Sequence, residues 1–150
     1  MQQSGTYEIS RPIDEVWSGL NDVNVLAACI PGCQSIEQID EHNLLASVKA
    51  KVGPVNATFQ VSITLADIQA PNSYTLGGEV KGGAGVAKGE ARVALATIEG
   101  KGATNLTYEV SASVGGKLAQ VGSRLVDSAA RKMSDEFFSA FEQQLTNLLL

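Results

Sequence analysis

Residues 104–150 of the chain read TNLTYEVSASVGGKLAQVGSRLVDSAARKMSDEFFSAFEQQLTNLLL. Up to Val114, apolar residues alternate with polar ones, which predicts a half-buried strand. After Gly115 and Gly116 the spacing changes to three or four residues, which is the spacing of one face of an α-helix. This face consists of Leu118, Gly122, Leu125, Ala129, Met133, Phe137, Phe141, Leu145 and Leu148. The sequence therefore predicts one long C-terminal helix that begins near Leu118 and covers a sheet.

The predicted helix is longer than a small domain needs to close its core. At about 1.5 Å per residue it would span roughly 45 Å. A long helix that lies across a curved antiparallel sheet can enclose either side chains alone or a guest molecule. An internal cavity is therefore the first functional hypothesis.

The residues before this helix predict one strand, two short helices and a run of further strands. Pro12 lies near the start of the first short helix, and the second, capped by Asn21 and Asp22, ends by Pro31-Gly32. Alternating apolar residues separated by turn-forming residues then predict about seven antiparallel strands in all. Glycines in the stretch 77–89 are typical of bends, bulges or close approaches, so the sheet should be strongly curved. The predicted class is α+β.

Composition and charge exclude several classes of protein. The chain is 44% hydrophobic and 18% charged, which is typical of a globular protein, and we expect a single domain over residues 1–150. No apolar run approaches about 18 residues and the N-terminus lacks an apolar signal core, so a cytoplasmic location is expected. The net charge of −5 and the dispersal of the eleven basic residues along the chain argue against nucleic acid. The same balance disfavours electrostatic binding to anionic lipid.

Residues with catalytic or metal-binding chemistry are few. His42 is the only histidine and is expected to be a solvated turn residue. Cys29 and Cys33 form a C-x3-C pair without a second Cys or His pair, which is a poor zinc signal. We interpret both as reduced, partly buried thiols, with a disulfide or a redox sensor as the alternative. The sequence contains no nucleotide-binding glycine motif, so no cofactor and no metal are predicted.

The strand faces predicted to point inward are apolar and carry no carboxylate. Tyr7, Tyr74 and Tyr108 are the only potential acids on them. We interpret Tyr108 first as a core aromatic, second as a ligand contact and third as a general acid.

Three stretches of the chain resemble one known family. They are Leu20-Asn-Asp-Val-Asn-Val-Leu-Ala-Ala-Cys-Ile-Pro-Gly-Cys33, Thr104-Asn-Leu-Thr-Tyr-Glu-Val110, and Gly116-Lys-Leu-Ala-Gln-Val-Gly-Ser-Arg124 followed by Phe137-Phe138. In this order they are similar to the CoxG family of carbon monoxide dehydrogenase subunits, over nearly the whole chain. The resemblance implies a helix-grip fold of the START and Bet v 1 type, in which a sheet wraps around a long helix and encloses an apolar cavity.

The resemblance also implies a function. It points to an accessory role beside aerobic molybdenum-containing carbon monoxide dehydrogenases and related hydroxylases, with binding of lipid-like molecules such as quinones. Some relatives continue past the closing helix into a membrane-attaching tail, whereas this chain ends with Leu148-Leu149-Leu150. We interpret these leucines as the end of the helix face, and transient contact with the inner face of the membrane is the alternative.

The leading hypothesis is a non-enzymatic carrier of a hydrophobic small molecule, a quinone or a lipid. Its cavity should open near Pro31-Gly32, and Gly122 should leave room for the guest on the helix. The assignment of Leu76 and Val93 to the inward face requires that the glycine-rich stretch contains no bulge, because a bulge would turn these side chains to the other face of the sheet. The predicted contact residues are Leu26, Ile30, Pro31, Gly32, Phe59, Val61, Leu76, Val93, Leu106, Tyr108, Leu118, Gly122 and Leu125.

Two other functions stay open on the sequence alone. The first is an enzyme of the polyketide cyclase or dehydratase type, in which Tyr108 would act as the acid. The second is an assembly or docking factor for the dehydrogenase, with a cavity filled by side chains.

Overall fold

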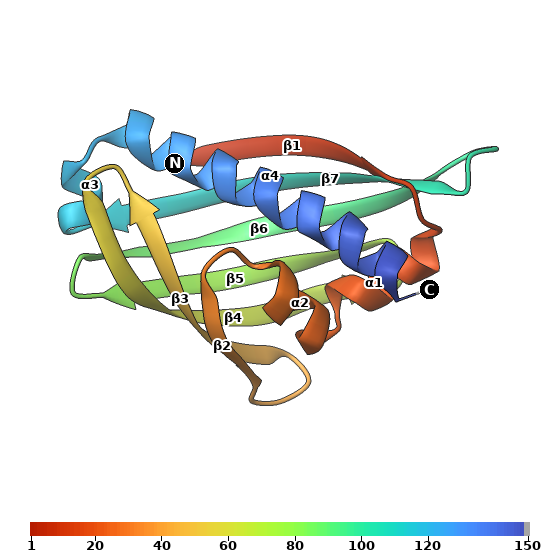
Figure 1. The fold of residues 1–150 in the computed structure, drawn as a ribbon, viewed down its shortest axis with the longest axis horizontal. Helices are drawn as coiled ribbons and strands as arrows, with labels where there is room; N and C mark the ends of the chain where they lie inside the picture. The colour runs from red at the N-terminus through yellow and green to blue at the C-terminus, as the bar shows by residue number, and fades with distance from the viewer. Residues whose placement is uncertain (149–150) are drawn as a thin grey trace.

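The computed structural model describes residues 1–148 and contains a seven-stranded antiparallel sheet with all its helices on one face (Figure 1). The strand order across the sheet is β1-β7-β6-β5-β4-β3-β2, so the first strand pairs with the last. The elements are β1 (Gln2–Ile9), α1 (Ile13–Leu20), α2 (Val23–Cys29), β2 (Cys33–Gln38), β3 (Asn43–Val52), β4 (Val55–Gln69), β5 (Ser73–Gly82), β6 (Gly85–Ile98), β7 (Ala103–Gly115), α3 (Lys117–Gln120) and α4 (Ser123–Asn147).

The predicted fold class and the count of about seven strands are confirmed. Figure 1 shows the strands curving around α4, which runs across the sheet, while α1 and α2 fill the space at one end. Helix α2 packs against α4, and α1 contacts both helices. The sheet and α4 therefore form the two walls between which a guest molecule could lie.

The glycine-rich stretch contains no bulge in its pairing with the neighbouring strands. The β5–β6 register is continuous from Ser73 opposite Ala94 to Gly82 opposite Gly85, and the register shift in β4 lies between Ala66 and Gln69. Leu76 and Val93 therefore keep the inward orientation that alternation predicted for them.

The turn after α2 is held tightly against β3. Gly32 has a φ of 75°, and the backbone N–H of Lys49 donates to its carbonyl oxygen at 2.9 Å. A Cβ atom at Gly32 would lie 1.9 Å from the carbonyl oxygen of Lys49, so no other residue fits here without a shift of the backbone. The Asp22 side chain caps the start of α2 by accepting from the N–H groups of Asn24 and Val25. Both ends of α2 are therefore fixed.

The C-terminal helix is interrupted near its start, contrary to the sequence prediction of one continuous helix. Gly122 separates α3 from α4 and has φ 95° and ψ 150°, a conformation that is essentially restricted to glycine. The break was invisible in the hydrophobic pattern because a small residue at the expected spacing counts as part of the helical face. Gly122 lies at the break and not on the helix.

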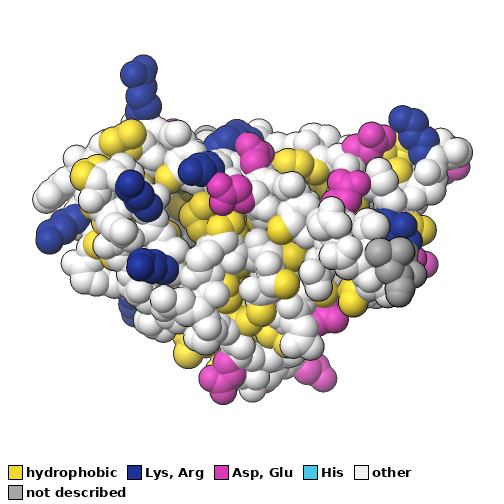
Figure 2. Space-filling model, viewed as in Figure 1, with side chains coloured by type: hydrophobic (Ala, Val, Ile, Leu, Met, Phe, Trp, Pro, Cys, Tyr) yellow, Lys and Arg dark blue, Asp and Glu magenta, His cyan; other side chains and the backbone are white. Residues whose placement is uncertain are grey.

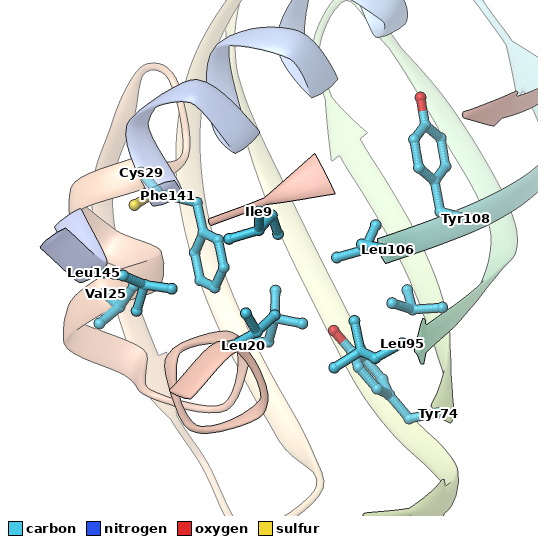
Figure 3. Close-up of a cluster of buried hydrophobic side chains, with 12 residues drawn as sticks. Ile9, Leu20, Val25, Cys29, Tyr74, Leu95, Leu106, Tyr108, Phe141 and Leu145 are labelled. Atoms are coloured by element: carbon cyan, nitrogen blue, oxygen red, sulfur yellow. The ribbon is translucent and has the colours of Figure 1, made fainter. Parts of the chain in front are cut away.

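The best-packed part of the core lies where α1 and α2 meet α4. Figure 3 shows Phe141 and Leu145 of α4 facing Leu20, Val25 and Ile9. Gly19 of α1 allows this close approach, because a Cβ atom there would lie 2.7 Å from a methyl group of Leu145. The region where α1 and α2 meet α4 is filled with side chains, so free space has to lie farther along α4.

The basic residues are dispersed in the sequence but gather at one end in space. Figure 2 shows most of the Lys and Arg side chains of the visible face at the end that carries α3 and the β3–β4 turn. At this end the backbone N–H of Leu118 donates to the carbonyl oxygen of Ala84 at 3.1 Å, which ties α3 to the β5–β6 turn. The segments at this end carry Lys49, Lys51, Lys81, Lys88, Lys117 and Arg124, and Lys81 and Lys88 form ion pairs with Glu79. Dispersal of the basic residues along the sequence therefore does not carry over to the folded molecule.

Candidate functional site

A partly enclosed cavity of about 350 Å³ lies between the sheet, α2 and α4. Figure 2 shows hydrophobic side chains at the surface in the band between α4 and the β2–β3 hairpin. The lining consists of Leu20, Asn21, Val23, Leu26, Ile30, Gln38, Glu41, Leu44, Ile63, Leu65, Tyr74, Leu76, Ala91, Val93, Tyr108, Val110, Ser134, Phe137 and Phe138. Most of these side chains are apolar, so the cavity suits a hydrophobic guest.

The floor of the cavity is a set of cross-strand rows on the inward face of the sheet. In one row Leu76 lies opposite Leu65 on one side and Ala91 on the other, and Ala91 in turn lies opposite Val110. The methyl group of Ala91 is small between two larger neighbours, which leaves part of this row unfilled. The alternation of the strands therefore supplies an apolar surface, and the size of Ala91 contributes free volume.

The roof and the rim come from the helices and the β2–β3 hairpin. Phe137 and Phe138 of α4 cover the floor, and Leu26 of α2 closes one side. Among the lining residues, Gln38 and Glu41 of the hairpin are exposed, as is Asn21 beside α2. The opening therefore lies between α2 and the hairpin, and not at Pro31-Gly32 as the sequence predicted.

The structure brings five of the thirteen predicted contact residues to this cavity. They are Leu26, Ile30, Leu76, Val93 and Tyr108. Pro31, Gly32, Phe59, Val61, Leu106, Leu118, Gly122 and Leu125 are absent from its lining.

The remaining predicted residues have other positions in the fold. Leu106 is fully buried in the core, whereas Leu125 is 43% exposed beside the β3–β4 turn. Phe59 packs near Gly82, and Leu118 packs near Gly85. Alternation assigned the inward strand residues to the correct face, but it carries no information on where along a strand the free space lies.

Sequence reasoning missed several lining residues that belong to recognisable patterns. Leu44, Ile63, Leu65 and Val110 all lie on alternating faces that were recognised but not assigned to the cavity. Phe138 had no signal of this kind, because it follows Phe137 directly and lies beside the main apolar face of the helix.

An aromatic cluster lies on the β1 side of the cavity, where Phe138 and Tyr108 belong to the lining and Tyr7 stacks on Phe138 from outside the lining. Tyr7 and Phe138 stack with their ring centroids 4.3 Å apart, and Tyr108 stacks on Phe138 at 6.0 Å. The hydroxyl of Tyr7 donates to the Asp135 carboxylate, and burial, followed by this hydrogen bond, raises the pKa of Tyr7. These contacts fasten α4 to the first and last strands.

The hydroxyl of Tyr108 is engaged although its ring lines the cavity. Nη1 of Arg131 donates to it at 3.2 Å and also donates to the carbonyl oxygen of Ser4 at 3.1 Å. A Cβ atom at Gly5, directly across from Tyr108 on β1, would lie 2.6 Å from the ring. The glycine therefore provides the space in which this ring lies.

The two cysteines are free thiols with different exposure. Cys29 is buried in the core, and burial raises the pKa of its thiol. Cys33 is half-buried at the start of β2. The reduced state of the two thiols stays a prediction.

A broader hollow of about 860 Å³ lies on the opposite, helix-free face of the sheet. Its lining includes Glu90, Arg92 and Glu109, whose charged side chains are exposed. This hollow is open to solvent, and charged side chains border it. The cavity beneath α4 is therefore the candidate binding site.

The architecture and the internal apolar cavity define a helix-grip protein of the START and Bet v 1 type. The chain is similar to a START superfamily protein from Mycobacterium smegmatis, with 14% identity, a TM-score of 0.74 and 98% of each chain covered. It is also similar to the ZhuI aromatase/cyclase from Streptomyces sp. R1128, with 13% identity, a TM-score of 0.67 and coverage of 100% of this chain and 96% of that one. At these identities the likeness shows the fold alone.

The sequence pattern of the CoxG family of carbon monoxide dehydrogenase subunits matches residues 5–146, so the chain belongs to this family. A conserved protein from Geobacillus kaustophilus is 32% identical, with a TM-score of 0.93 over 98% of this chain and 96% of that one. No curated protein is significantly similar in sequence. Among the described helices, none combines the length and the apolar character needed to cross a bilayer.

Proposed function

We propose that this protein binds a quinone or another lipid-like molecule in the cavity beneath α4 and carries it without converting it. The observation that supports this proposal is the cavity itself, with a volume of about 350 Å³, an apolar floor and an opening beside α2. Ligand sites in proteins typically enclose about 300–1,000 Å³ and combine apolar walls with a few polar groups. The volume is at the small end of this range, so a ring or a short chain fits inside and a longer tail would leave through the opening.

Burial of apolar surface is sufficient to hold such a guest. If the guest buried ~300 Å² of apolar surface, the gross stabilisation would be roughly 7 kcal/mol at about 25 cal/mol per Å², before the cost of association is subtracted. The net affinity would be moderate, which suits a carrier that must load and release. We propose Leu26, Ile30, Leu76, Val93 and Tyr108 as contacts of the guest.

The chemistry of the lining favours carriage over catalysis. General acid–base catalysis needs a titratable group within hydrogen-bond reach of the substrate. The hydroxyl of Tyr108 already accepts a hydrogen bond from Arg131, and Glu41 is exposed at the rim. Among the described lining residues, no carboxylate faces the interior beside a second titratable group, which counts against the cyclase alternative.

The family supplies the proposed partner. Because the family is described as one of carbon monoxide dehydrogenase subunits, we propose that the protein serves such an enzyme or a related molybdenum hydroxylase as an accessory component. Its cargo dissolves in membranes, so loading requires contact with the inner face of the membrane. The basic end that contains Lys117 and Arg124 is a suitable surface for anionic headgroups.

Native mass spectrometry of protein purified gently in the presence of membranes tests the carrier function. The wild type should retain a stoichiometric quinone or lipid that organic extraction releases. In Ala91→Phe the new ring would fill the free space between Leu76 and Val110, and the variant should be empty. Ala96→Phe, on the exposed face of the same strand, is the matched control and should load normally.

Two results would count against the carrier function or redirect it. A wild-type protein that is empty and takes up no added quinone or lipid would refute carriage. Equal recovery of a dehydrogenase partner by the empty wild type and by Ala91→Phe would then favour a docking factor.

A further inference from the structure

Two tyrosines line the cavity from the floor, but their hydroxyl groups have different environments. The hydroxyl of Tyr108 is bound by Arg131. Tyr74 is only 6% exposed, and among residues 1–148 the structure shows no hydrogen-bond partner for its hydroxyl. Figure 3 shows the Tyr74 side chain reaching from β5 into the interior toward Leu20. The hydroxyl of Tyr108 points in another direction, away from Tyr74 and Leu20. One phenol of the cavity is therefore satisfied by the protein and the other is free.

The ring of Tyr74 is held in place by its neighbours. It lies edge-on to the ring of Trp17 in α1, with the centroids 5.4 Å apart and an interplanar angle of 85°. On the sheet it pairs with Val93 of β6, whose side chain also lines the cavity. Packing on both sides therefore fixes the orientation of the ring.

The Tyr74 hydroxyl has no hydrogen-bond partner among residues 1–148, and it is not one of the fully enclosed unpaired side-chain atoms, so it keeps access to the cavity that Tyr74 lines. It can therefore donate to a molecule that enters the cavity. A tyrosine hydroxyl is protonated at neutral pH and can donate, and burial raises the pKa of Tyr74 further. A guest with an acceptor oxygen at this point forms a hydrogen bond that a hydrocarbon of the same shape cannot form. The free hydroxyl therefore discriminates between guests that the apolar walls would accept equally.

The charges around the cavity limit the guest further. Among the described lining residues there is no Lys or Arg, and the one carboxylate, that of Glu41, lies at the rim. A guest carboxylate inside would have to be desolvated without a cation to pair with, which is strongly unfavourable. A neutral acceptor such as a carbonyl oxygen avoids this cost.

We propose that Tyr74 is the hydrogen-bond donor that selects and orients the guest, and that the guest is a neutral apolar molecule with a carbonyl oxygen. This inference rests on the proposed carrier function and deepens it. The oxygen-bearing end enters first and lies against Tyr74, while the apolar tail extends toward Leu26 and the opening beside Gln38.

A matched pair of small probes tests the role of Tyr74. The first is 2,3-dimethyl-1,4-naphthoquinone, and the second is 2,3-dimethylnaphthalene, which keeps the ring skeleton and lacks both oxygens. Equilibrium dialysis gives the dissociation constant of each probe for the wild type, for Tyr74→Phe and for Tyr7→Phe. Tyr7→Phe is the control, because it removes a hydroxyl that bonds Asp135 and that lies outside the lining.

The expected result is selective for the oxygenated probe. Tyr74→Phe should weaken binding of the naphthoquinone by about three- to tenfold, the range of one neutral hydrogen bond. The affinity of Tyr74→Phe for the hydrocarbon and the affinity of Tyr7→Phe for both probes should stay at wild-type values. Equal weakening of both probes by Tyr74→Phe, or no weakening of either, would overturn the role of Tyr74 while leaving the carrier function intact.

Two further outcomes complete the test. If the wild type binds neither probe and no other lipid, the proposed function fails and this inference fails with it.

Methyl laurate and laurate test the requirement for a neutral guest, and the ester should bind more tightly. Tighter binding of laurate would overturn that requirement.

Discussion

Single residues decide how closely the elements of this fold approach one another. Gly5 of β1 lies opposite Tyr108 of β7 and leaves the space that the tyrosine ring occupies. Gly32 has the same function at the end of α2, where the carbonyl oxygen of Lys49 fills the position of a Cβ atom. Both glycines matter because the missing Cβ atom leaves room for a neighbouring group. Hydrophobic periodicity gives no signal for such positions.

The substitution Gly5→Ala tests the contact with the Tyr108 ring. The new methyl carbon would lie 2.6 Å from that ring, which Arg131 and Phe138 hold in place. We expect a loss of about 1–3 kcal/mol in the free energy of unfolding, which is typical of overpacking. Urea denaturation provides the measurement.

Gly83→Ala is the matched control, because nothing lies within 4 Å of a Cβ atom at that turn position. Its stability should equal that of the wild type or exceed it slightly, since alanine restricts the unfolded chain. Equal stability of the two variants would show that the ring has room to move.

At the scale of elements, alternation and turn chemistry were enough to predict the sheet apart from one edge strand. The strands β3, β4 and β7 carry long runs of alternating apolar residues, and their inward faces are as predicted. The short edge strand β2 has Ile36 as its one aliphatic residue, so hydrophobic alternation could not identify it. The cavity was predicted only in outline, because alternation identifies a face while the free volume depends on the sizes of neighbouring residues such as Ala91.

The break between α3 and α4 leads to a prediction that differs from the one made on the sequence. Gly122 has φ 95°, and a Cβ atom there would meet nothing within 4 Å. Gly122→Ala should therefore cost about 1–3 kcal/mol of stability through backbone strain and leave binding of 2,3-dimethyl-1,4-naphthoquinone unchanged.

Chemical denaturation and equilibrium dialysis on the same sample separate the two effects. Weaker binding at wild-type stability would restore the sequence-based hypothesis that Gly122 makes room for the guest.

At the scale of the whole molecule, the charges are distributed unevenly over the surface, which the net charge of −5 does not reveal. Two turns, α3 and the start of α4 bring basic residues together at one end, although they are widely separated in the sequence. The exposed side chains of Val86 and Leu125, 49% and 43% exposed, belong to the β6 and α4 segments at this end. Basic and apolar groups side by side are typical of surfaces that contact anionic membranes.

Removal of two charges from this end should weaken the proposed membrane contact. Each basic residue near an anionic surface contributes about 1 kcal/mol, so Lys117→Gln with Arg124→Gln should lower partitioning onto phosphatidylglycerol vesicles by roughly tenfold or more. Vesicle co-sedimentation at low salt measures this partitioning, and added salt should reduce binding of the wild type to the vesicles.

Arg92→Gln with Lys101→Gln removes the same charge from other parts of the molecule and serves as the control. An equal loss in both double variants would show that net charge acts without a defined surface. Strong binding to purely neutral vesicles would contradict an electrostatic contact.

The pairing of β1 with β7 also has a consequence for synthesis of the protein on the ribosome. Gln2 pairs with Ser111, so the first strand emerges long before its partner exists. At about 5–20 residues per second this interval is on the order of 5 to 20 s. During that time β1 is an unprotected segment, and its alternate residues Gln2, Ser4, Thr6 and Glu8 make it a poor template for self-association with other nascent chains.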